Sequence, residues 1–146
     1  MAEPYFYPGP KRIVAALKLA GFPDNSLITM TAIHGAETSG NVWVISVMNS
    51  NGTRDYGAFQ ISATTPPQNW TNYFENARLA LPLYQRRGYE PWYGYGRINT
   101  QFGLSKHPTW TYLDWAKAGF VQYRAEVAEG YSLARIASTY LLEDGL

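Results

Sequence analysis

The 146-residue chain contains no cysteine, which excludes disulfide bonds, thiolate nucleophiles and zinc sites built from thiolates. It also has almost no net charge, with 12 Lys and Arg against 11 Asp and Glu, so charge gives no case for a nucleic-acid partner. No apolar run approaches the roughly 20 residues that span a bilayer, and the first residues have no apolar core of a secretory signal. We therefore expect no membrane partner and no signal peptide.

Aromatic residues are plentiful: 12 Tyr, 6 Phe and 5 Trp. Such rings offer flat contact surfaces with polar handles, which suit sugar rings and an ordinary core equally well. The length favours one domain over 1–146 that buries its own core. Three prolines in residues 1–10 indicate an extended N-terminal arm.

Apolar periodicity predicts a mostly helical α+β fold. Helices are expected over 11–20, from about 24–26 to 38, from about 73 with a perturbation near Pro82, and as a pair between 109 and 142 broken near Gly130. The β-branched run VWVISV, residues 42–47, predicts a strand, and DYGAFQIS, residues 55–62, could return beside it after the Asn51-Gly52 turn. A small hairpin is therefore expected after the second helix.

Two carboxylates occupy contrasting settings in this region. Glu37 follows a mostly uncharged run and extends the core-facing stripe of the second helix, whereas Asp55 follows the polar Asn51-Gly52 turn. Glycoside hydrolysis needs such a pair: an apolar site keeps one carboxyl protonated as the acid, and a polar site keeps the other ionised. Taken alone, each residue is more often a solvated glutamate or a turn aspartate.

A metal site is a weaker alternative. His34 and Glu37 are three residues apart and could share one helix face, as metal ligands do. The sequence has no second pair of this kind and no cysteine, so His34 is expected at the edge of the core. We predict no metal and no cofactor.

The stretch NSNGTRDYGAFQIS, residues 49–62, resembles the active-site hairpin of c-type lysozymes and their relatives, including lytic transglycosylases. That hairpin follows the pattern Asn-x-Asp-Gly-Ser-Thr-Asp-Tyr-Gly-x-x-Gln-Ile-Asn. The positions that match it in register are Asn49, Gly52, Asp55, Tyr56, Gly57, Gln60 and Ile61. The family's catalytic glutamate lies on the preceding helix, where this chain has Glu37.

A second match is GYEPWYGY, residues 88–95, which resembles the family's Gly-x-x-Ala-Trp-x-Ala-Trp segment. The resemblance, over roughly residues 24–97, implies that Glu37 and Asp55 are catalytic. It implies that Trp92 packs against Glu37 and that four residues bind substrate: Asn49, Gln60, Trp92 and Tyr95. Asn49 is expected to hydrogen-bond either Asp55 or the sugar. The implied activity is cleavage of the β-1,4 bond between N-acetylmuramic acid and N-acetylglucosamine in peptidoglycan.

Departures from the family pattern leave alternatives open. Lytic transglycosylases share the glutamate and the Gly-x-x-Gln-Ile run but usually lack the aspartate, so Asp55 favours a hydrolase. A non-catalytic virion or wall-binding module would not require both carboxylates. Animal c-type lysozymes typically contain disulfides, and this chain has none. The resemblance therefore indicates a distant relative, such as a phage tail lysozyme or endolysin domain. We therefore expect bacterial peptidoglycan and other tail proteins as partners, in a virion or in the host cytoplasm before release.

Overall fold

The computed structural model describes residues 5–103 and 106–138. Its helices are α1 (Pro10–Ala20), α2 (Leu27–Thr38), α3 (Tyr73–Arg87), α4 (Tyr112–Ala128) and α5 (Leu133–Ala137), with short 3-10 helices η1 (Asp24–Ser26) and η2 (Tyr93–Arg97). The only sheet in the described chain pairs strands β1 (Arg54–Tyr56) and β2 (Ile61–Ala63). The fold is α+β and mostly helical, which confirms the predicted class.

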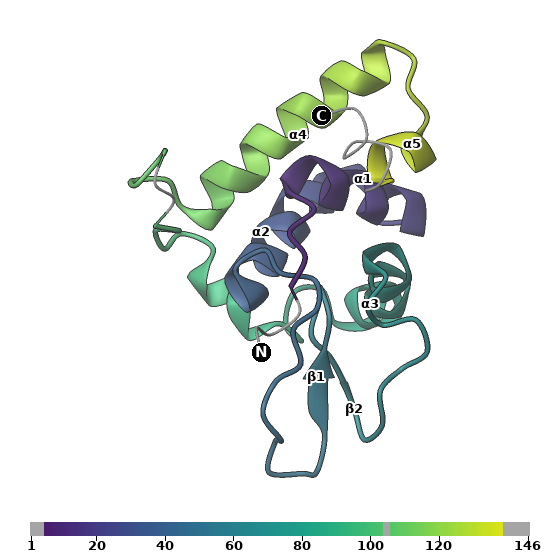
Figure 1. Ribbon diagram of the computed structural model, residues 1–146, viewed down its shortest axis with the longest axis vertical. Coiled ribbons are helices and arrows are strands. Elements are labelled where there is room, and N and C mark those ends of the chain that lie inside the picture. Colours follow the sequence, from purple (N-terminus) through teal and green to yellow (C-terminus); the bar gives the residue numbers. More distant parts are fainter. Residues whose placement is uncertain (1–4, 104–105, 139–146) are drawn as a thin grey trace.

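Helix α2 lies at the centre of the helical part, and α1 and α4 pack beside it (Figure 1). It is buried on nearly all faces, including Leu27, Met30 and Ile33. A Cβ atom added at Gly35 would lie 2.9 Å from ring carbons of both Tyr112 and Trp115. The absence of a side chain at Gly35 therefore lets α4 pack closely on the C-terminal half of α2, the half that carries Glu37.

The helix boundaries follow local sequence signals. Helix α1 has Pro10 in its first turn, where the missing N–H costs no hydrogen bond. The side chain of Asn72 caps α3 by accepting the Glu75 N–H. Helix α3 continues through Pro82 to Arg87, so the perturbation expected at that proline does not end the helix. Of the two predicted C-terminal helices, the part from 139 to 142 lies outside the described residues.

The strand predicted over 42–47 is absent, and this prediction was wrong. Only Ile45 forms an isolated bridge, to Tyr56, and the rest of the segment is irregular. Its backbone instead makes single bonds to separate partners: Val42 N–H donates to the Phe6 carbonyl, and Ser46 N–H donates to the Asp55 carbonyl. The real hairpin lies within residues 54–63, with Asp55 opposite Ser62.

The hairpin projects from one end of the molecule, below the helices in Figure 1. Within the described residues, no helix combines the length and apolar character needed to cross a bilayer.

Candidate active site

Glu37 lies in the last turn of α2 and is half-buried. One carboxyl oxygen, Oε2, accepts a hydrogen bond of 2.6 Å from the backbone N–H of Gly94 in η2. A Cβ atom at residue 94 would stand 2.9 Å from this same oxygen and 3.0 Å from the Glu37 Cγ. Glycine is therefore needed at 94 for the backbone to approach the carboxyl group so closely.

Burial raises the pKa of Glu37 above that of an ordinary glutamate. The Gly94 N–H and the positive charge of Arg97 act in the opposite direction, and the negative charge of Asp55 adds to the rise. Burial prevails, so the pKa remains raised. The acid form of Glu37 consequently persists to higher pH than in a free glutamate, as a proton donor requires.

Asp55 is held in a polar setting in the middle of β1. Its Oδ1 accepts hydrogen bonds from Asn49 Nδ2 at 3.2 Å and from the hydroxyl of Ser62 at 2.5 Å. The bond from Asn49 to Asp55 is one of the two alternatives expected for Asn49. Because both donors bind Oδ1, they orient the carboxyl group while Oδ2 takes neither bond.

The turn between β1 and β2 joins three parts of the molecule. The Nδ1–H of His34 on α2 donates to the Ala58 carbonyl at 2.8 Å. The next residue, Phe59, donates its N–H to Asn76 Oδ1 on α3 and accepts the indole N–H of Trp92 at its carbonyl, both at 2.8 Å. These buried bonds fix the hairpin that carries Asp55 relative to the helix that carries Glu37.

His34 is fully buried rather than at the edge of the core. Burial lowers its pKa to about 4, so the ring is neutral near neutral pH, with its Nδ1 proton bonded to Ala58. No cluster of three potential ligands for a metal occurs in residues 5–103 and 106–138. His34 thus links α2 to the hairpin.

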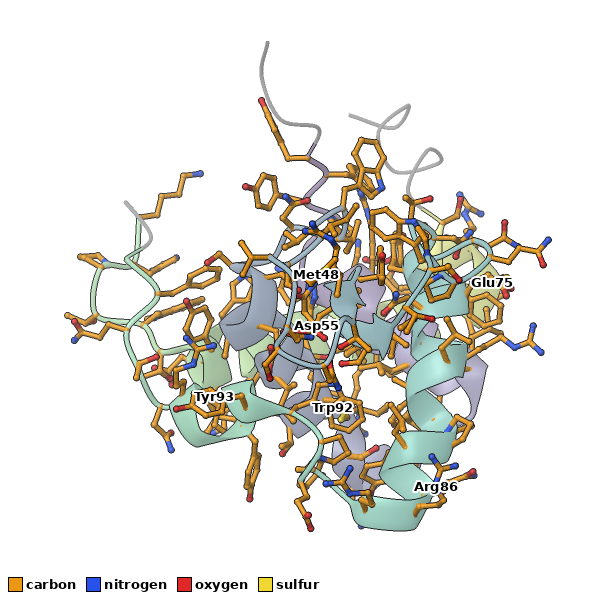
Figure 2. The ribbon with its side chains drawn as sticks, turned by 90° about the horizontal axis from the view of Figure 1, so that it is seen from below. Met48, Asp55, Glu75, Arg86, Trp92 and Tyr93 are labelled. Atoms are coloured by element: carbon orange, nitrogen blue, oxygen red, sulfur yellow. The ribbon has the colours of Figure 1, made fainter. Side chains whose placement is uncertain are left out.

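The predicted substrate-binding residues differ in exposure and in the contacts that they make. Trp92 is buried and holds Phe59 through its indole N–H. The amide nitrogen of Gln60 donates to the Val44 and Gly57 carbonyls at 3.1 and 3.0 Å, so it braces the hairpin. Tyr95 is 46% exposed. In Figure 2, Trp92 and Tyr93 lie on one side of Asp55 and Met48 lies on the other.

Comparison with known proteins bears on the family of this chain. No protein-family model matches the chain. The protein named Lysozyme 2 from Lucilia sericata is 34% identical to it over 98 residues, which cover 64% of this chain and 68% of that lysozyme. The chain belongs to the lysozyme-like superfamily. At the level of the family, it is a glycoside hydrolase, the class whose chemistry uses two carboxyl groups in different environments.

Arg97 is a residue of this lysozyme-like site that the sequence did not reveal. Its Nη2 donates to the Ala36 carbonyl at 2.9 Å, and its charge lowers the pKa of Glu37. A spacing signal does exist, because residues three apart align on a 3-10 helix and Arg97 is three residues after Gly94. This spacing can be interpreted only once residues 93–97 are known to form the 3-10 helix η2.

We predict that Arg97→Gln moves the descending, high-pH limb of the activity profile to higher pH. Activity needs protonated Glu37, and removing the nearby positive charge raises the pKa of that carboxyl further. The profile of kcat/KM against pH measures this limb. Arg86→Gln, an exposed arginine at the end of α3, is the matched control and should leave the limb in place. A limb that moves to lower pH in Arg97→Gln contradicts the prediction.

The same raised pKa has a consequence for stability. The folded state holds the Glu37 proton more tightly than the unfolded chain does. This contribution to stability is therefore complete below the ordinary glutamate pKa and is lost as pH rises through the raised value.

Proposed function

We propose that the protein is a muramidase that hydrolyses the β-1,4 bond between N-acetylmuramic acid and N-acetylglucosamine, with Glu37 as general acid and Asp55 as nucleophile or electrostatic stabiliser. The observation that carries this proposal is the pair of unlike carboxyl environments. Burial raises the pKa of Glu37, and Asp55 is near enough for its charge to add to that rise. Membership of the lysozyme-like superfamily supports the same chemistry.

The hydrogen bonds suggest which oxygen of each carboxyl group reacts. Gly94 N–H binds Glu37 Oε2, so the transferable proton belongs on Oε1. Glu37 gives this proton to the glycosidic oxygen as the bond from that oxygen to the anomeric carbon breaks, and the sugar becomes oxocarbenium-like. Asn49 and Ser62 bind Oδ1 of Asp55, which leaves Oδ2 to face the anomeric carbon. Glu37, now ionised, then takes a proton from the water that completes hydrolysis.

Three of the residues predicted to bind substrate are instead proposed to position other parts of the site. Asn49 orients Asp55, and Gln60 and Trp92 hold the hairpin and its neighbours in place. Tyr95 packs on Tyr89, with ring centroids 5.0 Å apart and planes inclined by 19°, and we propose that its exposed part lines the substrate cleft. No cofactor has a part in this scheme.

Digestion of purified bacterial peptidoglycan tests the proposed function. The protein should clear a wall suspension and release new reducing ends on muramic acid, detected by borohydride labelling and mass spectrometry. Binding to the walls without release of any fragment would instead favour the non-catalytic wall-binding module.

The biological setting is a further proposal: bacterial wall as partner, in a phage tail alongside other tail proteins or as an endolysin made in the host cytoplasm. It is supported by the absence of cysteine, which sets the chain apart from disulfide-bonded animal lysozymes. The insect relative gives it no support. Mass spectrometry of purified particles tests the tail setting, whereas a chain found only in the lysate at lysis would favour the endolysin.

A further inference from the structure

Tyr93 presents its ring to solvent at the edge of the candidate active site. It is 86% exposed, the highest value for any large hydrophobic residue in residues 5–103 and 106–138. Both of its neighbours in sequence make hydrogen bonds within the site: Trp92 donates to Phe59 in the hairpin turn, and Gly94 donates to the carboxyl group of Glu37. Figure 2 shows Tyr93 directed away from the packed interior around Trp92.

The ring of Tyr93 has a different environment from the other aromatic rings of this segment. Trp92 is buried, and Tyr95 stacks on Tyr89. Tyr93 instead lies against a cation: the guanidinium carbon of Arg97 is 5.8 Å from its ring centroid. Arg97 is itself tied to the Ala36 carbonyl, one residue from Glu37. The cation therefore restrains the ring from one side while its remaining surface stays open.

The position of Tyr93 limits what an exposed ring there could contact. Its Cα is about 3.8 Å from that of Gly94, the fixed spacing across a trans peptide bond. Gly94 N–H is 2.6 Å from Glu37 Oε2. The exposed ring of Tyr93 therefore belongs to the residue next to the N–H that binds the proposed acid, on the same short helix η2. A pyranose ring offers an apolar face of C–H groups and an equatorial rim of hydroxyls, which match a flat ring with a polar tip.

We propose that Tyr93 is a sugar-stacking residue that binds the N-acetylhexosamine unit beside the scissile bond, with Arg97 restraining its ring. The ligand class is a β-1,4-linked N-acetylhexosamine oligomer. This inference rests on the proposed function and adds a specificity-determining residue to the same site. The hydroxyl of Tyr93 is not required for stacking, so the ring itself should carry the effect.

Binding of N-acetylglucosamine hexamer, measured by calorimetry in a Glu37→Gln background, separates stacking from catalysis. Tyr93→Ala should weaken binding roughly threefold to tenfold, the range for a lost aromatic contact, and Tyr93→Phe should bind nearly as well as the parent. The matched control is Tyr131→Ala. Tyr131 also pairs with an arginine, with Arg135 4.6 Å from its centroid, but lies between α4 and α5 at the opposite end from the hairpin (Figure 1).

Cleavage gives a second readout in the otherwise wild-type protein. If Tyr93 holds a sugar beside the scissile bond, Tyr93→Ala should raise KM and change the ratio of product lengths from the hexamer. Tyr131→Ala should change neither quantity. The melting temperature of Tyr93→Ala should match that of the parent, because the ring is exposed.

The outcomes separate this inference from the function it rests on. Parent-like hexamer affinity and product ratio in Tyr93→Ala would overturn the stacking role while leaving the muramidase intact. Failure of the parent protein to bind or cleave any N-acetylhexosamine oligomer or peptidoglycan would overturn both. Equal weakening in Tyr93→Phe and Tyr93→Ala would assign the effect to the hydroxyl and also contradict stacking.

Discussion

Glu37→Gln should reduce wall cleavage by roughly 100- to 10,000-fold, the range for loss of a positioned general acid. Glutamine keeps the size of the side chain, and its amide oxygen can still accept the Gly94 N–H that now binds Oε2. It has no proton of suitable acidity to give to the leaving oxygen. The measurement is the initial rate of reducing-end release from soluble peptidoglycan, with circular dichroism and the melting temperature reporting on the fold.

The matched control for this variant is Glu75→Gln. Glu75 is also half-buried, but it lies on α3 and pairs with Arg78 at 3.5 Å, away from Asp55 in Figure 2. A weak ion pair of this kind contributes little to stability, so the control should keep parent activity. Parent-like cleavage by a folded Glu37→Gln protein would remove Glu37 from the mechanism. It would leave the carboxyl group at the end of α2 without an assigned role.

Asp55→Asn should reduce the rate by about 100- to 1,000-fold, as does the loss of one preorganised electrostatic group. The amide can retain the bonds from Asn49 and Ser62 at its oxygen, so the hairpin should keep its form. A neutral amide cannot balance the positive charge that develops at the anomeric carbon. The rate measured on soluble peptidoglycan should fall while the melting temperature changes little. Asp24→Asn, an exposed aspartate paired with Lys18, is the control.

The end group of the product, measured together with the Asp55→Asn rate, distinguishes hydrolysis from lytic transglycosylation. A hydrolase adds water and leaves a reducing muramic acid. A lytic transglycosylase closes the muramic acid onto its own hydroxyl, so its product is lighter by one water and needs no second carboxylate. We expect reducing ends from the wild-type protein. Anhydromuramic ends together with an active Asp55→Asn variant would assign the transglycosylase reaction, using Glu37 alone, and make Asp55 a turn residue.

Local patterns in the sequence were sufficient for most of the helices. Apolar spacing located α1 and α2, and the predicted start near residue 73 and the break near Gly130 agree with the bounds of α3 and α4. These features depend on residues within one or two turns of each other, so a linear reading can detect them. The same reading failed for residues 42–47, where β-branched residues predicted a strand. A strand requires a continuous partner, and this segment finds only the single bridge at Ile45.

The order of residues along the chain was enough to predict that one carboxylate would end an apolar helix and that another would follow a polar turn. It also provided the hairpin motif that led from Glu37 and Asp55 to a lysozyme-like site. The surroundings of the first carboxylate, in contrast, follow from the packing of distant segments. The N–H that binds Glu37 comes from Gly94, 57 residues later, and Arg97 and Tyr93 arrive with it on η2. Burial, charge and hydrogen bonding set a pKa through space, so contacts made by folding fix the properties of this acid.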